Sequence, residues 1–104
     1  MRAVRIHAAA AEEAVEAAAW YEREQPGLGA DFENAINAAL DVLEQDVVPL
    51  TSLLGVTRAR GVKRLLLRRF PYSVVVSEGD EVIFVIAFAH HARRPGYWRE
   101  RLEA

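Results

Sequence analysis

The feature that most constrains this chain is an almost wholly apolar segment, EVIFVIAFA, at residues 81–89. Because it lacks a polar face, it should form a central strand of a sheet, covered on at least one side. Two further strand patterns precede it, VKRLLLRRF at 62–70 and YSVVVSE at 72–78. The sequence SEGDE predicts a hairpin turn, and Pro71 predicts a turn or a break in pairing between the first two strands. The C-terminal part of the chain therefore predicts a three-strand meander.

Two helical patterns come before these strands. Residues 9–24 are rich in alanine and glutamate, and a second helix starts near Leu28 and is ended by Pro49. Only the short EQPGLG segment separates them, so they should pack as an antiparallel hairpin. The apolar stripe of the first helix is assigned to Ala11, Ala14, Val15, Ala18 and Tyr21, with Glu12, Glu13 and Glu16 largely away from it. The stripe of the second helix comprises Leu28, Phe32, Ala35, Ile36, Ala39 and Leu43.

The remaining predicted elements are a short strand at residues 3–7, a loop at 50–61 and a short helix in the tail RPGYWRERLEA. The order of elements predicts an α+β fold, in which the helical hairpin packs on one face of an antiparallel sheet. At 104 residues, the chain should form one domain spanning 1–104. Trp20 and Tyr21 are assigned to core or edge packing. The core should include most of Phe32, Ile36, Leu43, Val74, Val76, Ile83, Val85 and Ile86.

Composition excludes several kinds of site. The absence of cysteine rules out disulfides, thiolate chemistry and cysteine metal sites, and three histidines leave little case for another metal site. We therefore expect neither a metal nor a cofactor. No apolar run is long enough to span a bilayer, and the N-terminal sequence lacks a secretory pattern. The sequence favours a cytoplasmic protein without a membrane partner.

Charge divides the chain into an acidic and a basic half. Residues 1–50 carry 3 basic and 10 acidic side chains, a net charge of −7, whereas residues 51–104 carry 10 basic and 5 acidic ones, a net charge of +5. One interpretation is that the two halves attract each other within the fold. The other is that a surface faces a polyanion or a charged partner, and the two interpretations are compatible.

Three stretches carry a resemblance to a known family: WYEREQPGLGADF at 20–32, RLLLRRFPYSVVV at 64–76 and VIAFAHHARRPGYWRER at 85–101. Together with the order of elements, they make nearly the whole chain similar to the RelE/ParE superfamily of type II toxin–antitoxin toxins. The resemblance implies a growth-inhibiting toxin that forms a hetero-oligomer with a cognate antitoxin. It leaves two targets open, since RelE-like members cut messenger RNA on the ribosome and ParE-like members inhibit DNA gyrase.

Under the RelE-like alternative, the resemblance implies a metal-independent endoribonuclease. His91 matches the base or cation at the end of the last strand, and Tyr97 matches a C-terminal tyrosine that handles protons. Arg68 or Arg93 would hold the phosphate. The departure is Tyr72, which stands where RelE-like members place a central-strand arginine.

The FPY turn is more usual among ParE-like members, so the balance favours inhibition of gyrase by binding. The target-binding residues would then be Arg69, Arg93, Arg94 and Trp98. The plain structural alternatives are that His90 and His91 cap the strand end and that Trp98 packs the tail onto the sheet. A non-toxic interaction module is a further alternative. The antitoxin would use the edge of the meander or the groove of the helical hairpin.

Overall fold

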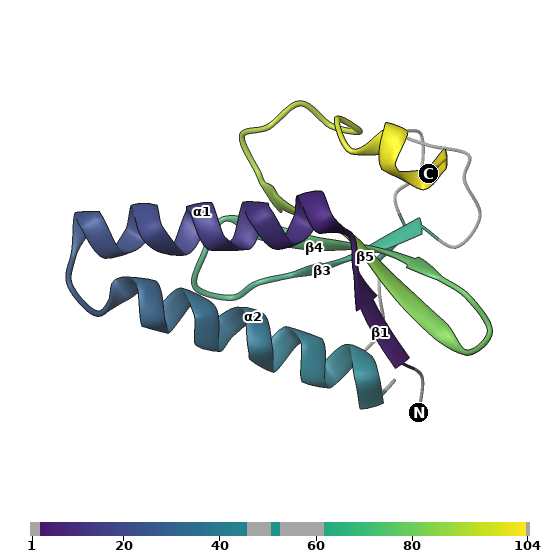
Figure 1. The fold of residues 1–104 in the computed structure, drawn as a ribbon, viewed down its shortest axis with the longest axis horizontal. Coiled ribbons are helices and arrows are strands. Elements are labelled where there is room, and N and C mark those ends of the chain that lie inside the picture. Colours follow the sequence, from purple (N-terminus) through teal and green to yellow (C-terminus); the bar gives the residue numbers. More distant parts are fainter. Residues whose placement is uncertain (1–2, 46–50, 53–61, 104) are drawn as a thin grey trace.

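The computed structural model describes residues 3–45, 51–52 and 62–103. The elements along the chain are β1 (Ala3–Ile6), α1 (Ala8–Glu24), α2 (Leu28–Gln45), β2 (Thr51–Ser52), β3 (Val62–Leu66), β4 (Tyr72–Glu78), β5 (Val82–His90) and the 3-10 helix η1 (Arg99–Glu103) (Figure 1). The predicted order of strand, two helices, three strands and a short C-terminal helix is confirmed, with η1 as that helix. Two details differ: Thr51 and Ser52, predicted as loop, form the strand β2 that pairs with β3, and β3 ends at Leu66 instead of residue 70. Pro49, which was predicted to end the second helix, lies outside the described residues. Most of the predicted loop at 50–61 lies outside them as well.

The strands form one sheet in the order β1-β5-β4-β3-β2. The meander β3-β4-β5 is antiparallel, as predicted, and Gly79 closes its second turn by donating its amide hydrogen to the Val82 carbonyl at 2.8 Å. The exception to the antiparallel pattern is β1, which pairs in parallel with the first half of β5, from Ala3 opposite Val82 to Ile6 opposite Val85. The apolar strand β5 is thereby central, between β1 and β4.

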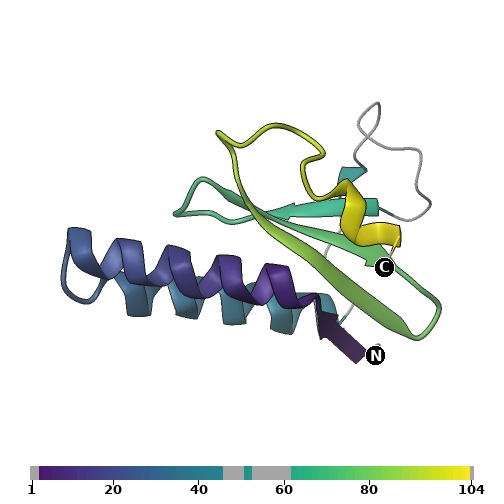
Figure 2. The same cartoon turned by 45° about the horizontal axis from the view of Figure 1, so that its top comes forward.

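The sheet separates two clusters of buried side chains. The α1–α2 hairpin covers one face, and the segment that leads into η1 covers the other (Figures 1 and 2). Beneath the hairpin, Phe32, Val74, Val76, Ile83 and Val85 are almost fully buried. On the other face, Trp98 packs against a smaller cluster that includes Val62, Val75, Ile86 and Ala87. All eight predicted core residues are buried, so that prediction is confirmed.

A β-bulge lies where β4 and β5 pair. Val75 is opposite Ala87 and Val76 is opposite Val85, so Ile86 is the extra residue. A bulge changes which face the neighbouring side chains occupy. Here both Ile86 and Ala87 belong to the cluster beneath Trp98, whereas Val85 and Phe88 belong to the cluster beneath the hairpin.

The turn between the helices is held by Glu22. Its carboxylate accepts hydrogen bonds from the amides of Gly27, at 2.9 and 3.1 Å, and of Gly29, at 3.0 Å. These amides lie at the N-terminus of α2, where a carboxylate is favourable. Gly29 also allows close packing, because a Cβ atom there would lie 2.6 Å from the Ala18 carbonyl oxygen.

The stripe assigned to the first helix is partly wrong. Ala18 is buried and Ala14 and Tyr21 are half-buried, as expected, but Ala11 and Val15 are exposed. Ala10 and Ala17 are buried instead. The buried face is therefore rotated, and the rotation turns Glu13 inward.

Candidate functional site

Glu13 of α1 is the centre of a polar cluster beside β5. Its side chain is only 13% exposed, and both carboxylate oxygens are occupied. Arg101 donates to them from both terminal nitrogens at 3.0 Å, and the Tyr97 hydroxyl donates to Oε2 at 2.6 Å. The Phe88 amide donates to Oε1 at 3.0 Å. One carboxylate thus joins α1, β5 and the C-terminal segment.

This cluster also satisfies the backbone of β5 where β1 has ended. The pairing of β1 with β5 stops at Val85. Beyond it, the Phe88 amide bonds to Glu13, and the Ile86 carbonyl accepts from Arg101 at 2.9 Å. A backbone group buried without a partner is costly, so the two side chains take the place of a neighbouring strand there. Their interaction fixes the C-terminal segment relative to the helical hairpin.

Arg93 and Tyr97 form a stacked pair at the edge of this cluster. The Arg93 guanidinium lies 3.7 Å from the centre of the Tyr97 ring and 3.8 Å from Glu13 Oε2. Burial raises the pKa of Tyr97 above its ordinary value, and the hydrogen bond to Glu13 and its negative charge raise the pKa further. The hydrogen bond to Glu13 likewise raises the pKa of Arg101. The phenol therefore holds its proton firmly.

A hollow of about 230 Å³ opens next to this pair. We call it the Trp20 hollow; its lining includes Glu13, Glu16, Trp20, Tyr72, His90 and Arg93. Core or edge packing was expected for both Trp20 and Tyr21. Tyr21 is half-buried and its ring contacts those of Phe32 and Phe70. Trp20 is 50% exposed, so half of its surface is in contact with solvent. The ring of Tyr72 meets that of His90 edge-on at 5.0 Å. The hollow thus combines aromatic walls with one cation at its rim.

The residues expected for RNA cleavage are bonded to different partners. His91 Nε2 lies 3.0 Å from the hydroxyl oxygen of buried Ser73, and its backbone amide donates to the Pro71 carbonyl. Tyr97 is bonded to Glu13 and stacked with Arg93. Arg68 is exposed in the turn between β3 and β4. The structure therefore brings Tyr97 and Arg93 together, and His91 belongs to a separate contact.

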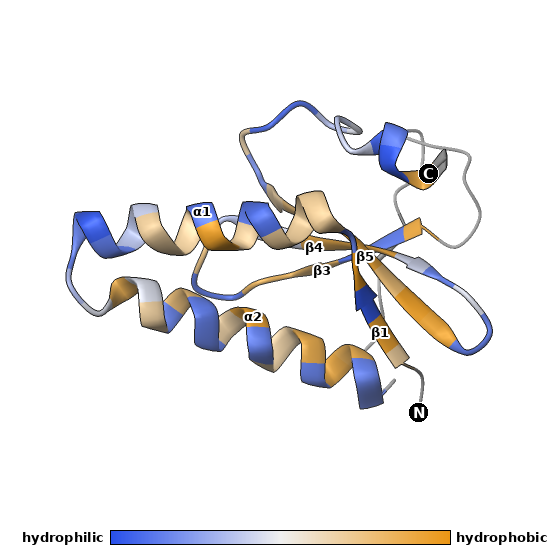
Figure 3. Ribbon diagram, viewed as in Figure 1, coloured by the Kyte–Doolittle hydropathy of each residue, from blue (hydrophilic) through white to orange (hydrophobic). Residues whose placement is uncertain are grey.

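The residues expected to bind a target are also dispersed. Arg69 is exposed at the β3–β4 turn, 3.5 Å from Asp31, and its guanidinium lies over Phe70. Arg94 is exposed in the hydrophilic segment that follows β5 (Figure 3). Trp98 is only 3% exposed and packs on the sheet, which is the structural alternative considered for it. Its role in target binding stays a prediction.

Glu13 and Arg101 were not among the residues predicted for the site. The two residues are 88 positions apart in the chain. Arg101 ends the stretch 85–101 that resembles the family, but no role was predicted for it, and Glu13 lies outside all three stretches. The one available signal was that Glu13 interrupts an otherwise alanine-rich helix face. Its significance depends on the rotation of that face toward β5.

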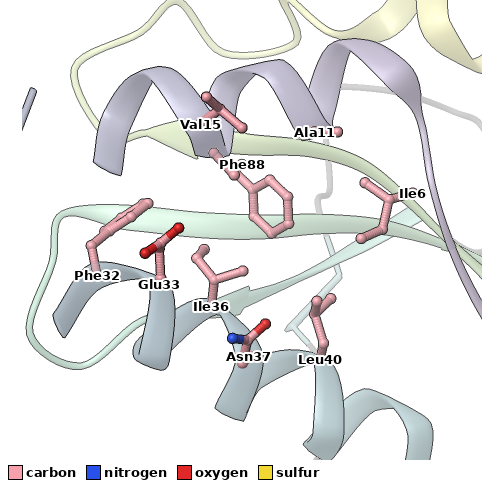
Figure 4. A pocket seen from close by; sticks show the side chains of 10 residues that line it. Ile6, Ala11, Val15, Phe32, Glu33, Ile36, Asn37, Leu40 and Phe88 are labelled. Carbon is pink, nitrogen blue, oxygen red and sulfur yellow. The ribbon is translucent and has the colours of Figure 1, made fainter. Parts of the chain in front are cut away.

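A second hollow runs between the two helices. This hairpin groove has a volume of about 220 Å³, and its lining includes Ile6, Ala14, Val15, Ile36, Leu40 and Phe88. Phe88 lies between the side chains of the two helices, and Glu33 and Asn37 stand on the α2 side (Figure 4). Val15 is 69% exposed and Ile6 is 42% exposed. The groove is therefore apolar and partly open to solvent.

The described residues were also considered for a metal site and for a membrane-spanning helix. At residues 3–45, 51–52 and 62–103, no group of three His, Asp or Glu side chains could hold a metal ion. Neither α1 nor α2 has the length and apolar character needed to cross a membrane.

Comparison with known proteins gives a match in fold. A solved structure described as the chromosomal ParDE TA system from P. aeruginosa contains a chain that superposes with a TM-score of 0.71. The match covers 86% of this chain and 96% of that chain, at 17% sequence identity. No protein-family model matches the sequence, and none of the curated proteins does. The chain therefore has a ParE-like fold.

Proposed function

We propose that the chain is the toxin of a type II toxin–antitoxin system and that a cognate antitoxin neutralises it. The observation that carries the proposal is the fold, because the matched chain belongs to a ParDE TA system and the match extends over 86% of this chain. Fold alone does not fix function. The motifs around FPY and HHARRPGYW, which resemble the same superfamily, support the proposal independently of the fold match.

We further propose that the toxin acts by binding DNA gyrase and does not cut RNA. RNA cleavage needs a group that can give up a proton. The Tyr97 hydroxyl donates to Glu13 at 2.6 Å, and burial together with that carboxylate raises the pKa of the phenol. Tyr72 also stands where a phosphate-binding arginine is expected in RNA-cleaving relatives. Both features favour a binding mechanism.

The antitoxin segment that we propose is basic and amphipathic, and it lies in the hairpin groove. Residues 8–45, which contain both helices, carry one basic and nine acidic side chains, a net charge of −8. The groove itself is apolar, with Val15 and Ile6 exposed along it. A helix that presents apolar residues to the groove and lysines or arginines to its flanks would complement both properties. The result would be a hetero-oligomer of toxin and antitoxin.

The test has two levels. Expression of the chain alone should arrest growth, and co-expression of the adjacent gene should restore it; normal growth at verified toxin levels would contradict the toxin assignment. The purified chain should then inhibit gyrase supercoiling while leaving messenger RNA intact on translating ribosomes. Codon-spaced cuts that disappear in His91→Ala would establish the RNA-cleaving alternative instead.

A further inference from the structure

We propose that the Trp20 hollow is the surface by which the chain binds its target, that the target is a protein, and that the hollow receives one large apolar side chain of that protein. The inference rests on the proposed function and deepens it, because it locates the contact and names its chemistry. It differs from the sequence-based prediction, which placed the contact on Arg69, Arg93, Arg94 and Trp98. Of these four, Arg93 alone lines the hollow.

Trp20 exposes a large apolar surface at the hollow. Its ring makes an edge contact with Tyr21 at 5.2 Å, yet half of the residue remains in contact with solvent. An exposed indole is unfavourable in water and favourable once a partner covers it. Protein interfaces owe most of their affinity to a few residues, which are most often Trp, Tyr and Arg. The Trp20 hollow contains one of each, in Trp20, Tyr72 and Arg93.

Arg93 is held in position before any partner binds. Its guanidinium stacks on Tyr97 at 3.7 Å and lies 3.8 Å from Glu13, while its side chain remains 53% exposed. A side chain that is already ordered loses little conformational freedom on binding. Glu13 and Tyr97 are thus positioning residues, and the outer part of the guanidinium can still donate to a carbonyl of the partner.

The charges and the size of the hollow indicate the class of partner that it can bind. Glu13 and Glu16 both line the hollow, and Glu13 is paired with Arg93 and Arg101. A phosphate entering the hollow would therefore meet the exposed Glu16 carboxylate and an arginine that already lies against a carboxylate. This arrangement disfavours nucleic acid, whose binding depends on contacts between cations and phosphates. A volume of about 230 Å³ is also below the roughly 300–1,000 Å³ of small-molecule sites. A single apolar side chain of a protein surface fits the size and the aromatic walls of the hollow, and it brings no anion next to Glu16.

The experiment compares two matched pairs of variants, with growth arrest measured at equal protein levels and gyrase supercoiling measured with the purified chains. Trp20→Ala is paired with Phe84→Ala, since Phe84 is 45% exposed near the opposite end of β5. Arg93→Ala is paired with Arg94→Ala, its exposed neighbour outside the hollow. Trp20→Ala and Arg93→Ala should each raise the inhibitory concentration about tenfold or more, and the two controls should change it less than about threefold. Urea unfolding of each variant separates loss of contact from loss of fold.

The possible results distinguish failure of the inference from failure of the proposed function. Arrest by the wild-type chain that persists in Trp20→Ala, or that is lost equally in Phe84→Ala, overturns the inference and leaves the proposed function intact. No arrest by the wild-type chain overturns the proposed function, and the inference falls with it. Cleavage of ribosome-bound messenger RNA that is lost in Trp20→Ala would mean that the hollow binds RNA, which overturns the assignment to a protein target.

Discussion

Replacing Glu13 by alanine should be among the most damaging single changes in the protein. The substitution removes one carboxylate that accepts from Arg101, Tyr97 and the Phe88 amide. A hydrogen bond to a charged group contributes about 1.5–3 kcal/mol, and removal of one partner of a buried ion pair costs about 3–5 kcal/mol. The Glu13 and Arg101 side chains are 13% and 18% exposed, so water can reach them in part. We therefore expect the lower end, a loss of about 3 kcal/mol in the free energy of unfolding.

The assay is equilibrium unfolding in urea. With a slope of about 1–3 kcal/mol per molar urea, the expected loss lowers the midpoint by about 1–3 M. Glu13→Gln keeps the volume and one acceptor, so it should cost less than Glu13→Ala. The double variant with Arg101→Met removes the stranded charge, and the two changes should couple by about 1.5 kcal/mol or more. Glu12→Ala is the matched control, because Glu12 is the exposed neighbour on the same helix and should matter by less than about 0.5 kcal/mol.

Two results would refute this reasoning. The first is a Glu13→Ala variant as stable as the Glu12→Ala control, which would mean that the cluster contributes nothing net. The second is strict additivity of Glu13→Ala and Arg101→Met. In that case each residue would act through packing alone, and the ion pair would not hold the C-terminal segment to α1.

Three other predictions concern stability. Ile36→Ala, at a position only 6% exposed, should cost about 2–4 kcal/mol in urea unfolding through the cavity it leaves; a cost below about 0.5 kcal/mol would mean that α2 packs differently. Gly29→Ala should cost about 1–3 kcal/mol in the same assay, because its Cβ would lie 2.6 Å from the Ala18 carbonyl oxygen; an unchanged midpoint would contradict the close packing of the helices. Stability should also fall as pH rises above about 10: burial raises the pKa of Tyr97 above 10.0 in the folded chain, so the unfolded chain releases that proton first and the slope of stability against pH is negative. Tyr97→Phe should make that slope shallower in urea unfolding at several alkaline pH values; burial also raises the pKa of Tyr21 and of Tyr72, so part of the slope should remain. An equal slope in the two proteins would refute the assignment.

The sequence predicted the elements and the main core because those depend on local periodicity. The apolar residues of α2 lie on a single face, and β4 and β5 are apolar over most of their length. The burial of residues such as Ile36 and Val74 could therefore be predicted from the sequence. The buried face of α1 could not be predicted in the same way. Its face is mostly alanine, which gives little contrast between alternatives, and contact with β5 decides which alanines are buried. The predicted phase of that helix places Glu13 away from the buried face, whereas the observed rotation places it at the centre of the site.

Pairing between strands far apart in the sequence was the second feature that the sequence did not predict. The parallel contact of β1 with β5 joins residues about 80 apart, and no local pattern specifies it. The same pairing ends at Val85 and leaves the Phe88 amide and the Ile86 carbonyl to be satisfied by side chains. The Trp20 hollow depends on this arrangement, since α1, β5 and the C-terminal segment meet there. Sequence identified Arg93 and Tyr97 as candidates, but their stacking required the fold.

The two interpretations of the charge asymmetry apply to different residues. Within the described part of the chain, Asp31 and Glu13 make ion pairs to the basic half, through Arg69, Arg93 and Arg101. The other acidic side chains of the helical hairpin are exposed: Glu12, Glu16, Glu22, Glu24, Glu33, Asp41 and Glu44. Attraction between the halves is therefore local, and most of the acidic surface faces solvent, where like charges repel and lower stability. A basic antitoxin segment would relieve that repulsion. Because it would bind the folded chain only, it would also stabilise the chain in proportion to the logarithm of its free concentration over its Kd.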